Sequence, residues 1–273
     1  MVNVGRMRIF LRSVVRHRVR RKLERLLIEV LGGYAVEAAA AADARAERLG
    51  AELGAARAAL VGLEVRMRRD LHFAAEVEAA VSSSRFARDH MPTVPTFAHR
   101  DDTLRFAAEL VTIEGMVLEF GVASGRTLRI LTECLPGRGV AGIDTFTGLP
   151  EHWRSGFPIG AFSQQSPPVV CGAELVVGLF AETLPEFLAA RPDPVALLHL
   201  NADLYSSTRT VLDLVGDRLV PGSIVLFDEY FNYPGWPDGE HRAWSEFVER
   251  TGRAFEYTGY TYNDEQVVVT IMA

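Results

Sequence analysis

The sequence VLEFGVASG occupies residues 117–125 and passes from an apolar, β-rich run through two glycines into a predicted helix. Gly121 and Gly125 allow the backbone to approach a ligand closely, as nucleotide-binding turns require. About twenty residues later the next β-rich run ends in Asp144, an acid placed to accept hydrogen bonds from the two hydroxyls of a ribose. The order strand, glycine turn, helix, strand, acid therefore predicts a nucleoside cofactor.

Outward from this segment, strands and helices alternate. The β-rich runs lie at residues 115–120, 140–143, 175–177, 195–200, 223–227, 255–260 and 266–271, with helical stretches between the earlier ones. This alternation predicts a doubly wound, Rossmann-like α/β sheet of seven strands, in which ligands bind beyond the carboxyl ends of the strands. The last two runs are joined by the short polar loop 261–265, so we expect them to form an antiparallel C-terminal hairpin at the sheet edge.

The first part of the chain has a different pattern, which predicts an α-helical N-terminal arm. Apolar residues there alternate spacings of four and three, the a and d pattern of a coiled coil. They are Leu49, Leu53, Ala56, Leu60, Leu63 and Met67, with weakening glycines among them. We expect an arm at residues 1–81, a linker at 82–100 and the α/β domain at 101–273. The seam predicts a homodimer or a higher oligomer, and the alternative is a helical hairpin packed on its own α/β domain.

Charge divides near the same place. The net charge is −6, but residues 1–100 carry 18 Lys and Arg against 11 Asp and Glu, whereas residues 101–273 carry 11 against 24. An acidic α/β domain is a poor partner for nucleic acid, since phosphate binding needs a positive surface. The basic stretch from Arg6 to Arg25 suits contact with an anionic membrane surface.

Composition is that of an ordinary globular protein. Hydrophobic residues make up 48% of the 273 and charged residues 23%, which excludes a disordered or collagen-like chain. Cys134 and Cys171 form no disulfide framework and have no metal-ligand spacing, so we expect a cytoplasmic protein. No stretch reaches the roughly 18 apolar residues of a membrane-spanning helix.

Five ordered motifs carry a resemblance to a known family. They are EFG at 119–121, DTFTGLP at 144–150, ETLP at 182–185, LHLNADLYSST at 198–208 and FDEY at 227–230. Together they resemble the class I S-adenosylmethionine-dependent O-methyltransferases of the macrocin O-methyltransferase family, which act on sugars of macrolide and aminocoumarin antibiotics. The resemblance spans residues 92–273 and implies an enzyme that methylates a hydroxyl of a sugar or a glycosylated natural product. Methylation of a catechol or phenol, and a non-catalytic nucleoside-binding scaffold, are the alternatives.

The cofactor implied by the resemblance is S-adenosylmethionine. The negative charge of Glu119 would repel a pyrophosphate but suits the cationic amino group of a methionine moiety, which favours S-adenosylmethionine over NAD. The expected cofactor contacts are Glu119, Gly121, Ser124, Gly125, Asp144 and Thr145.

The resemblance also implies a Mg²⁺ site at the strand ends. Similar enzymes hold the ion with an aspartate at the position of Asn201 and two adjacent acids at the positions of Asp228 and Glu229. Oxygen ligands suit such a hard divalent ion. Because Asn201 is neutral and Glu229 replaces the usual aspartate, we expect these three residues to hold Mg²⁺ more weakly than in the relatives.

Asp203 is the residue that similar enzymes offer as the general base. A sugar hydroxyl is a very weak acid, so its proton must leave as the methyl group arrives. His152, in the loop after the cofactor strand, is a second candidate because histidine exchanges protons near neutral pH. We expect His199 in the core and aromatic residues around the acceptor. The aromatic candidates are Phe157, Phe162, Tyr230, Phe231, Tyr233, Trp236 and Trp244.

Overall fold

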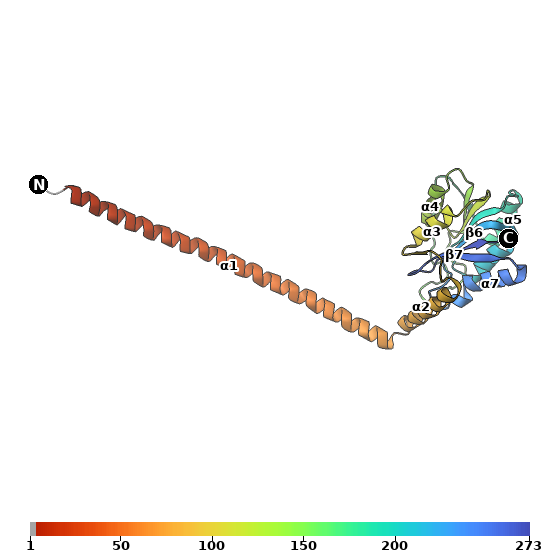
Figure 1. The fold of residues 1–273 in the computed structure, drawn as a ribbon, viewed down its shortest axis with the longest axis horizontal. Helices are drawn as coiled ribbons and strands as arrows, with labels where there is room; N and C mark the ends of the chain where they lie inside the picture. The colour runs from red at the N-terminus through yellow and green to blue at the C-terminus, as the bar shows by residue number, and fades with distance from the viewer. Residues whose placement is uncertain (1–3) are drawn as a thin grey trace. The chain divides into compact units, whose positions relative to one another are not determined.

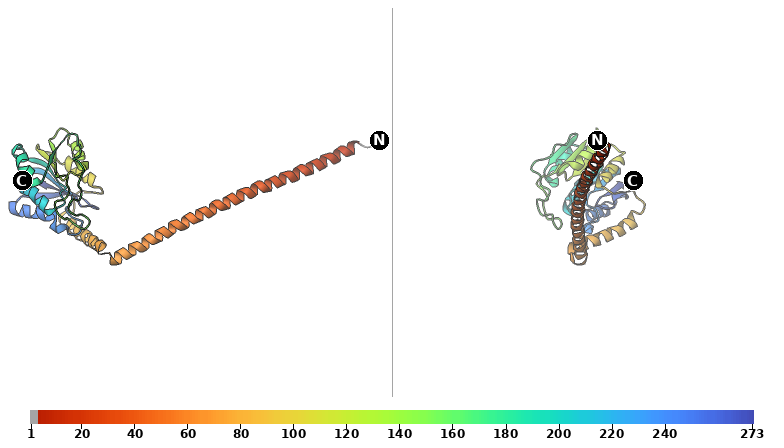
Figure 2. Two further views of the ribbon diagram at one scale, coloured as in Figure 1. Left: turned by 180° about the vertical axis from the view of Figure 1, so that it is seen from behind. Right: turned by 90° about the vertical axis from the view of Figure 1, so that its left-hand side faces the viewer.

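The computed structural model describes the backbone of residues 4–273 and the side chains of residues 16–273. The chain divides into two compact units, Met1–Asp70 and Leu71–Ala273. The first unit is one continuous helix, α1 (Val4–Arg69), visible in Figures 1 and 2. Its many alanines have the highest helix propensity of any residue, which offsets the cost of the glycines within it. The side chains of the arginines before residue 16 lie outside the described residues.

Helix α2 (Leu71–His90) belongs to the second unit and corrects the predicted linker. Residues 82–90 continue this helix instead of forming a loop. The indole Nε1 of Trp236 donates a hydrogen bond to the hydroxyl of Ser82 at 3.0 Å. The backbone N–H of Asn232 donates one to the hydroxyl of Ser83 at 2.8 Å. Serines typical of a linker therefore fix a helix against the α/β domain.

The second unit is built on an eight-stranded sheet of order β1-β7-β8-β6-β5-β2-β3-β4. The strands are β1 (Thr96–Phe97), β2 (Met116–Phe120), β3 (Val140–Asp144), β4 (Ala173–Val177), β5 (Val195–Leu200), β6 (Leu219–Phe227), β7 (Phe255–Thr261) and β8 (Val267–Ile271). All seven predicted strands are present, and the two-residue β1 adds an eighth beside β7. Strand β8 runs antiparallel to both β6 and β7, which confirms the C-terminal hairpin.

Helices cover both faces of the sheet, as expected for a doubly wound fold. They are α3 (Arg100–Glu109), α4 (Arg126–Cys134), α5 (Phe180–Ala189), α6 (Tyr205–Val215) and α7 (Glu240–Thr251), with short 3₁₀ turns η1 (Gly216–Arg218) and η2 (Trp236–Asp238). Side chains of β2 alternate between two cores: Val117 packs in the same cluster as α3 and α4, whereas Leu118 and Phe120 pack in that of α2, α5, α6 and α7. A strand covered on both faces is mostly apolar, which explains the run in β2 apart from its buried Glu119.

The register of three parallel strands places their carboxyl ends in one row. Phe120 of β2 is paired with Leu200 of β5, and Leu200 is paired with Phe227 of β6. The residues that follow these strands therefore emerge side by side, at the edge of the sheet where ligands bind in such folds. Within the part of the chain that the structure describes, no helix is long and apolar enough to cross a membrane.

Candidate active site

Gly121 and Gly125 shape the turn between β2 and α4. Gly121 has a φ of +89°, and a Cβ there would overlap the carbonyl oxygen of Asn201. Gly125 has a φ of +73° and immediately precedes the first residue of α4. A residue with a Cβ atom disfavours both the positive φ and this close contact with neighbouring atoms. Glycine thus lets the turn lie against the end of β5.

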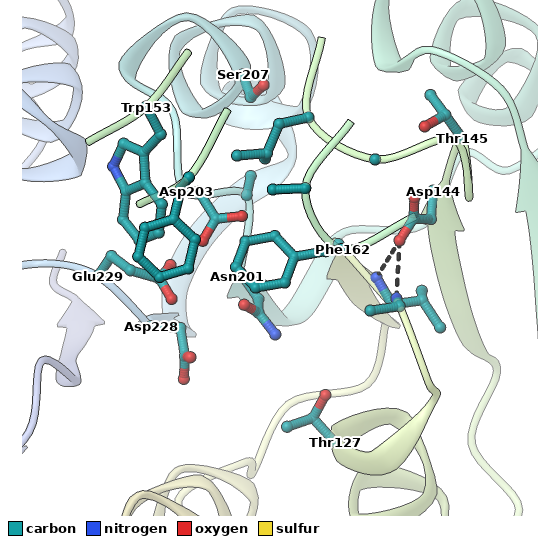
Figure 3. Close-up of a pocket in the computed structure, with 18 of the residues that line it drawn as sticks. Thr127, Asp144, Thr145, Trp153, Phe162, Asn201, Asp203, Ser207, Asp228 and Glu229 are labelled. Carbon is teal, nitrogen blue, oxygen red and sulfur yellow. Dashed lines mark hydrogen bonds between the residues drawn. The ribbon is translucent and has the colours of Figure 1, made fainter. Parts of the chain in front are cut away.

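Asp144 braces this turn from the end of β3. Its Oδ2 accepts hydrogen bonds from the backbone N–H groups of Val122 and Ala123, both at 2.8 Å (Figure 3). Its Oδ1 accepts a third from the N–H of Phe146 at 2.7 Å. Charge-assisted bonds of this kind are stronger than neutral ones. The acid predicted to bind a ribose therefore also holds the glycine turn in place.

A pocket of about 400 Å³ lies at this edge of the sheet. Of the six expected cofactor contacts, Gly121, Ser124, Asp144 and Thr145 line it. Gly125 is adjacent to the lining but does not take part in it. Figure 3 shows Asp144 and Thr145 on one side of the pocket and the carboxyl groups of Asp203, Asp228 and Glu229 on the other.

Glu119 does not reach the pocket, which corrects its expected role as a direct cofactor contact. Its side chain is fully buried within the sheet and accepts a hydrogen bond from the hydroxyl of Thr127 at 3.1 Å. Its other oxygen lies 2.9 Å from Nδ1 of His199, which is also fully buried. In β2 the side chain points toward α4 rather than toward the strand end. Glu119 therefore stabilises the site through Thr127 and His199 and does not contact the pocket itself.

His199 lies in the core, as expected, and links two acids. Its Nε2 lies 3.7 Å from Oδ1 of Asp228, on the opposite side of the ring from Glu119. Burial by itself lowers the pKa of His199, but its attraction to Asp228 and Glu119 outweighs burial and raises the pKa to about 9. The imidazolium therefore compensates buried negative charge beneath the pocket.

Four polar side chains meet at the opposite side of the pocket, which we call the acidic rim: Asn201, Asp203, Asp228 and Glu229. Asn201 and Asp203 follow β5, while Asp228 and Glu229 follow β6. The backbone N–H of Asp228 donates to the carbonyl of Leu200 at 2.8 Å, which fixes the two strand ends together. The sequence prediction that these four residues share one edge agrees with this arrangement.

Among the described residues, Asp203 and Glu229 of the acidic rim form no ion pair, whereas Asp228 lies 3.9 Å from the guanidinium of Arg100 and 3.7 Å from His199. Burial raises the pKa of Asp203 to about 7, with repulsion from Asp228 adding to the shift and Arg154 opposing it. Burial also raises the pKa of Glu229 well above its usual range, and the charges of Asp203 and Asp228 raise it further. Oε2 of Glu229 is buried without a hydrogen-bond partner among the described residues. A cation would relieve each of these costs.

Glu240, at the start of α7, is a member of the site that the sequence did not reveal. Its side chain is fully buried and accepts hydrogen bonds from the hydroxyl of Thr208 at 3.0 Å and from the backbone N–H of Glu229 at 3.1 Å. Thr208 lies in α6, directly after the Asp203 loop, so Glu240 ties the two halves of the acidic rim together. No local motif signals this role, because it depends on packing between α6, α7 and β6.

Part of the loop between β3 and β4 covers the pocket with aromatic rings. Trp153, Phe157 and Phe162 line the cavity. The guanidinium of Arg154 lies 3.9 Å from the centre of the Trp153 ring and donates to the Glu265 carboxylate at 2.9 Å. Because Glu265 precedes β8, this contact fastens the loop to the C-terminal hairpin.

The remaining sequence candidates lie elsewhere. His152 is exposed and does not line the pocket, so the structure gives no support to its role as a base. Five of the expected acceptor aromatics are buried instead in the core around α2 and α7. They are Tyr230, Phe231, Tyr233, Trp236 and Trp244. Their apolar rings contribute more to packing α2 and α7 than to the cavity.

The donor atoms at the expected metal site decide whether Mg²⁺ suits it. Among the described residues, no group of three or more His, Cys, Asp or Glu side chains is arranged to hold a metal ion. The expected set contains only two acids, Asp228 and Glu229, and the amide of Asn201. All three line the pocket, and the unpartnered Glu229 oxygen fits a hard cation. These residues thus fit Mg²⁺ as a low-charge set.

Comparison with known proteins agrees with this geometry. Residues 118–230 match the family model described as Methyltransferase domain. The chain is similar to the solved structure of CalS11, a calicheamicin methyltransferase, with 26% identity over 62% of this chain and 76% of CalS11 and a TM-score of 0.52. It shares the fold of the O-methyltransferase NovP, with 21% identity over 64% of this chain and 80% of NovP and a TM-score of 0.52. The sequence has no match among the curated proteins.

Proposed function

We propose that this class I methyltransferase transfers a methyl group from S-adenosylmethionine to a hydroxyl of a sugar or a glycosylated natural product. One observation carries the proposal: a single pocket is bounded by a glycine turn on one side and by the acidic rim on the other. The matched methyltransferase domain, residues 118–230, contains both. The similarity to a calicheamicin methyltransferase supports a natural-product acceptor.

The cofactor side is formed by Gly121, Ser124, Asp144 and Thr145. S-adenosylmethionine supplies a methyl group activated by a positively charged sulfur. Oδ2 of Asp144 accepts two hydrogen bonds from the glycine turn, and Oδ1 accepts one from the N–H of Phe146. Because a carboxylate offers about four acceptor sites, Oδ1 can still accept a hydrogen bond from a ribose hydroxyl. Asp144 would therefore contact both the glycine turn and the ribose of the bound cofactor.

Asp203 is proposed to accept the proton of the acceptor hydroxyl. The acceptor oxygen bonds to the methyl carbon as the carbon–sulfur bond breaks, and the proton passes to the Asp203 carboxylate. A pKa of about 7 makes this carboxylate a stronger base than an ordinary aspartate, yet much of it is ionised at neutral pH. Its left-handed backbone, with a φ of +60°, fixes the direction of the side chain.

Asn201, Asp228 and Glu229 are proposed to hold Mg²⁺, which when bound would polarise the acceptor hydroxyl. The chain's contribution is to hold the oxygens in place: His199 lies beside Asp228, and Glu240 accepts from the backbone of Glu229. Asn201 brings an amide oxygen without charge, so the ion is expected to bind weakly.

The acceptor is proposed to lie under Trp153, Phe157 and Phe162. Flat apolar rings suit the C–H face of a sugar and also the plane of a phenol. Both acceptor classes therefore belong in the test.

We also propose that the enzyme works in the cytoplasm as a homodimer. The two cysteines, Cys134 and Cys171, are both free, as is usual in a reducing compartment. Residues 1–70 of the arm form a separate structural unit, and their proposed role is association with a partner. Contact of its basic stretch with an anionic membrane surface is the competing proposal.

The test is mass-spectrometric detection of methyl transfer to a panel of glycosides, free sugars and catechols. We expect a mass gain of one methyl group on a sugar-containing acceptor, lost in Asp203→Asn but with cofactor binding retained. Transfer only to catechols would move the enzyme to the phenol class. Cofactor binding without transfer to any member of either class would favour the scaffold alternative.

A further inference from the structure

The segment that covers the pocket, residues 149–163, forms a closed loop of its own, which we call the cover. The backbone N–H of Leu149 donates to the carbonyl of Ala161 at 2.9 Å, and that of Gly160 donates to the carbonyl of Leu149 at 2.9 Å. Gly148 permits this closure, because a Cβ there would overlap the carbonyl oxygen of Ala161. In the part of the chain that the structure describes, every other bond between backbone groups that involves the cover also joins two of its own residues. Side chains therefore attach the cover to the rest of the domain, as in other compact surface loops.

Arg154 makes several of these attachments at once. Its guanidinium carbon lies 3.9 Å from the ring centre of Trp153, within the cover, and 4.6 Å from that of Tyr233, in the loop after β6. Nη1 of the same group donates to Glu265, between β7 and β8, at 2.9 Å. A cation within about 6 Å of an aromatic ring centre is attracted to the face of the ring. Arg154 thus joins the cover to two segments that lie far along the chain.

The other charged attachment of the cover is more open to solvent. Glu151 accepts a hydrogen bond from the hydroxyl of Ser206 at 2.5 Å, and both residues are exposed. The side chains of Arg154 and Glu265 are only 24% and 18% exposed. Because water weakens exposed charged contacts, the contacts of Arg154 contribute more to fixing the cover.

The cover lies where the acceptor is proposed to bind. Trp153 and Arg154 line the same pocket as Asp203 and Glu229. Figure 3 shows Trp153, Asp203 and Glu229 together on one side of the pocket, away from Asp144. An acceptor whose hydroxyl lies at Asp203 would therefore contact the Trp153 ring, and the orientation of that ring depends on Arg154.

We propose that Arg154 is a positioning residue for the acceptor, which fixes the cover and its Trp153 ring through contacts with Tyr233 and Glu265. The proposal rests on the methyl transfer proposed above and adds a residue that determines where the acceptor lies. A ring that is already fixed lowers the cost of ordering the acceptor beneath it. Loss of Arg154 should therefore appear in the KM of the acceptor and not in the affinity for the cofactor.

Kinetics and amide hydrogen exchange of Arg154→Met in the full chain test the proposal. Methionine keeps a long apolar side chain but has neither the charge nor the N–H donors. With the panel of glycosides, free sugars and catechols, the KM of each acceptor that the wild type methylates is expected to rise at least tenfold. The affinity for S-adenosylhomocysteine should stay within threefold of wild type, and amide exchange of residues 149–163 should become at least tenfold faster.

Arg242→Met is the matched control. Arg242 of α7 also lies over a ring, 4.7 Å from the centre of Tyr205, and donates to Glu246 at 2.8 Å. It does not line the pocket, so its loss should change neither the acceptor KM nor the exchange of the cover.

Glu265→Gln removes the charge partner of Arg154 from the side of the C-terminal hairpin. It is expected to raise the acceptor KM at least threefold. Combined with Arg154→Met, it should add less than twofold, because residues that act through one contact are not additive. Should Arg154→Met not fold, Glu265→Gln decides between the same outcomes.

Two results would overturn the proposal while leaving the proposed function intact. Faster exchange of the cover with an unchanged acceptor KM would mean that Arg154 fixes the loop without positioning the acceptor. A higher KM with unchanged exchange would mean that Arg154 binds the acceptor directly. If the wild type methylates no member of the panel, the proposed function is wrong and the proposal is wrong with it.

Discussion

The substitution Glu119→Gln tests whether Glu119 stabilises the site from within the sheet or contacts the cofactor directly. The substitution keeps the volume of a fully buried side chain but removes one charge of the pair with His199, whose Nδ1 lies 2.9 Å away. Leaving a buried charge without its partner costs about 3–5 kcal/mol. Here the loss is expected to be smaller, roughly 1–3 kcal/mol, because glutamine still hydrogen-bonds and Asp228 still faces the imidazole at 3.7 Å.

For a domain of this size, each kcal/mol lowers the Tm by about 2–4 °C. Thermal unfolding should therefore show a Tm lower by several degrees. Calorimetry with S-adenosylhomocysteine should show an affinity within about threefold of wild type, because Glu119 does not line the pocket. The matched control is Asp144→Asn, which lines the pocket and is expected to lose at least tenfold in affinity. An unchanged Tm with a tenfold weaker affinity for Glu119→Gln would refute this assignment and restore a direct contact.

The other predictions concern the acidic rim. Asp203→Asn should lower kcat by at least about a hundredfold, measured by methyl transfer, with little change in cofactor affinity. Burial raises the pKa of Glu240 to about 8, so the folded protein holds a proton that the unfolded chain has lost. Without metal, stability should therefore fall as pH rises from about 5 to 8, and Glu240→Gln should flatten this loss in thermal unfolding. Asn201→Asp adds a charged ligand and should tighten Mg²⁺ binding about tenfold, as measured by calorimetry. An unchanged Mg²⁺ affinity would contradict a ligand role for residue 201.

The fold and the place of the site can be read from local features of the sequence. Strand periodicity, glycine at position 121 and an acid at the end of the next strand are local features. Each depends on a few neighbouring residues, so all seven predicted strands and the C-terminal hairpin could be found without coordinates. The parallel order then required the residues after β5 and β6 to share one edge.

The role of each side chain at the site depends on contacts between distant elements. Glu119 turns away from the pocket because its place in β2 directs it toward Thr127 of α4 and His199 of the neighbouring strand β5. Glu240 acts on Glu229 through a contact between distant elements, and Ser83 anchors a helix where its composition suggested a linker. These roles depend on which residues meet across the sheet and between helices. Local sequence carries the periodicity of each element, whereas the partner of a buried polar group is set by the packing of elements far apart in the chain.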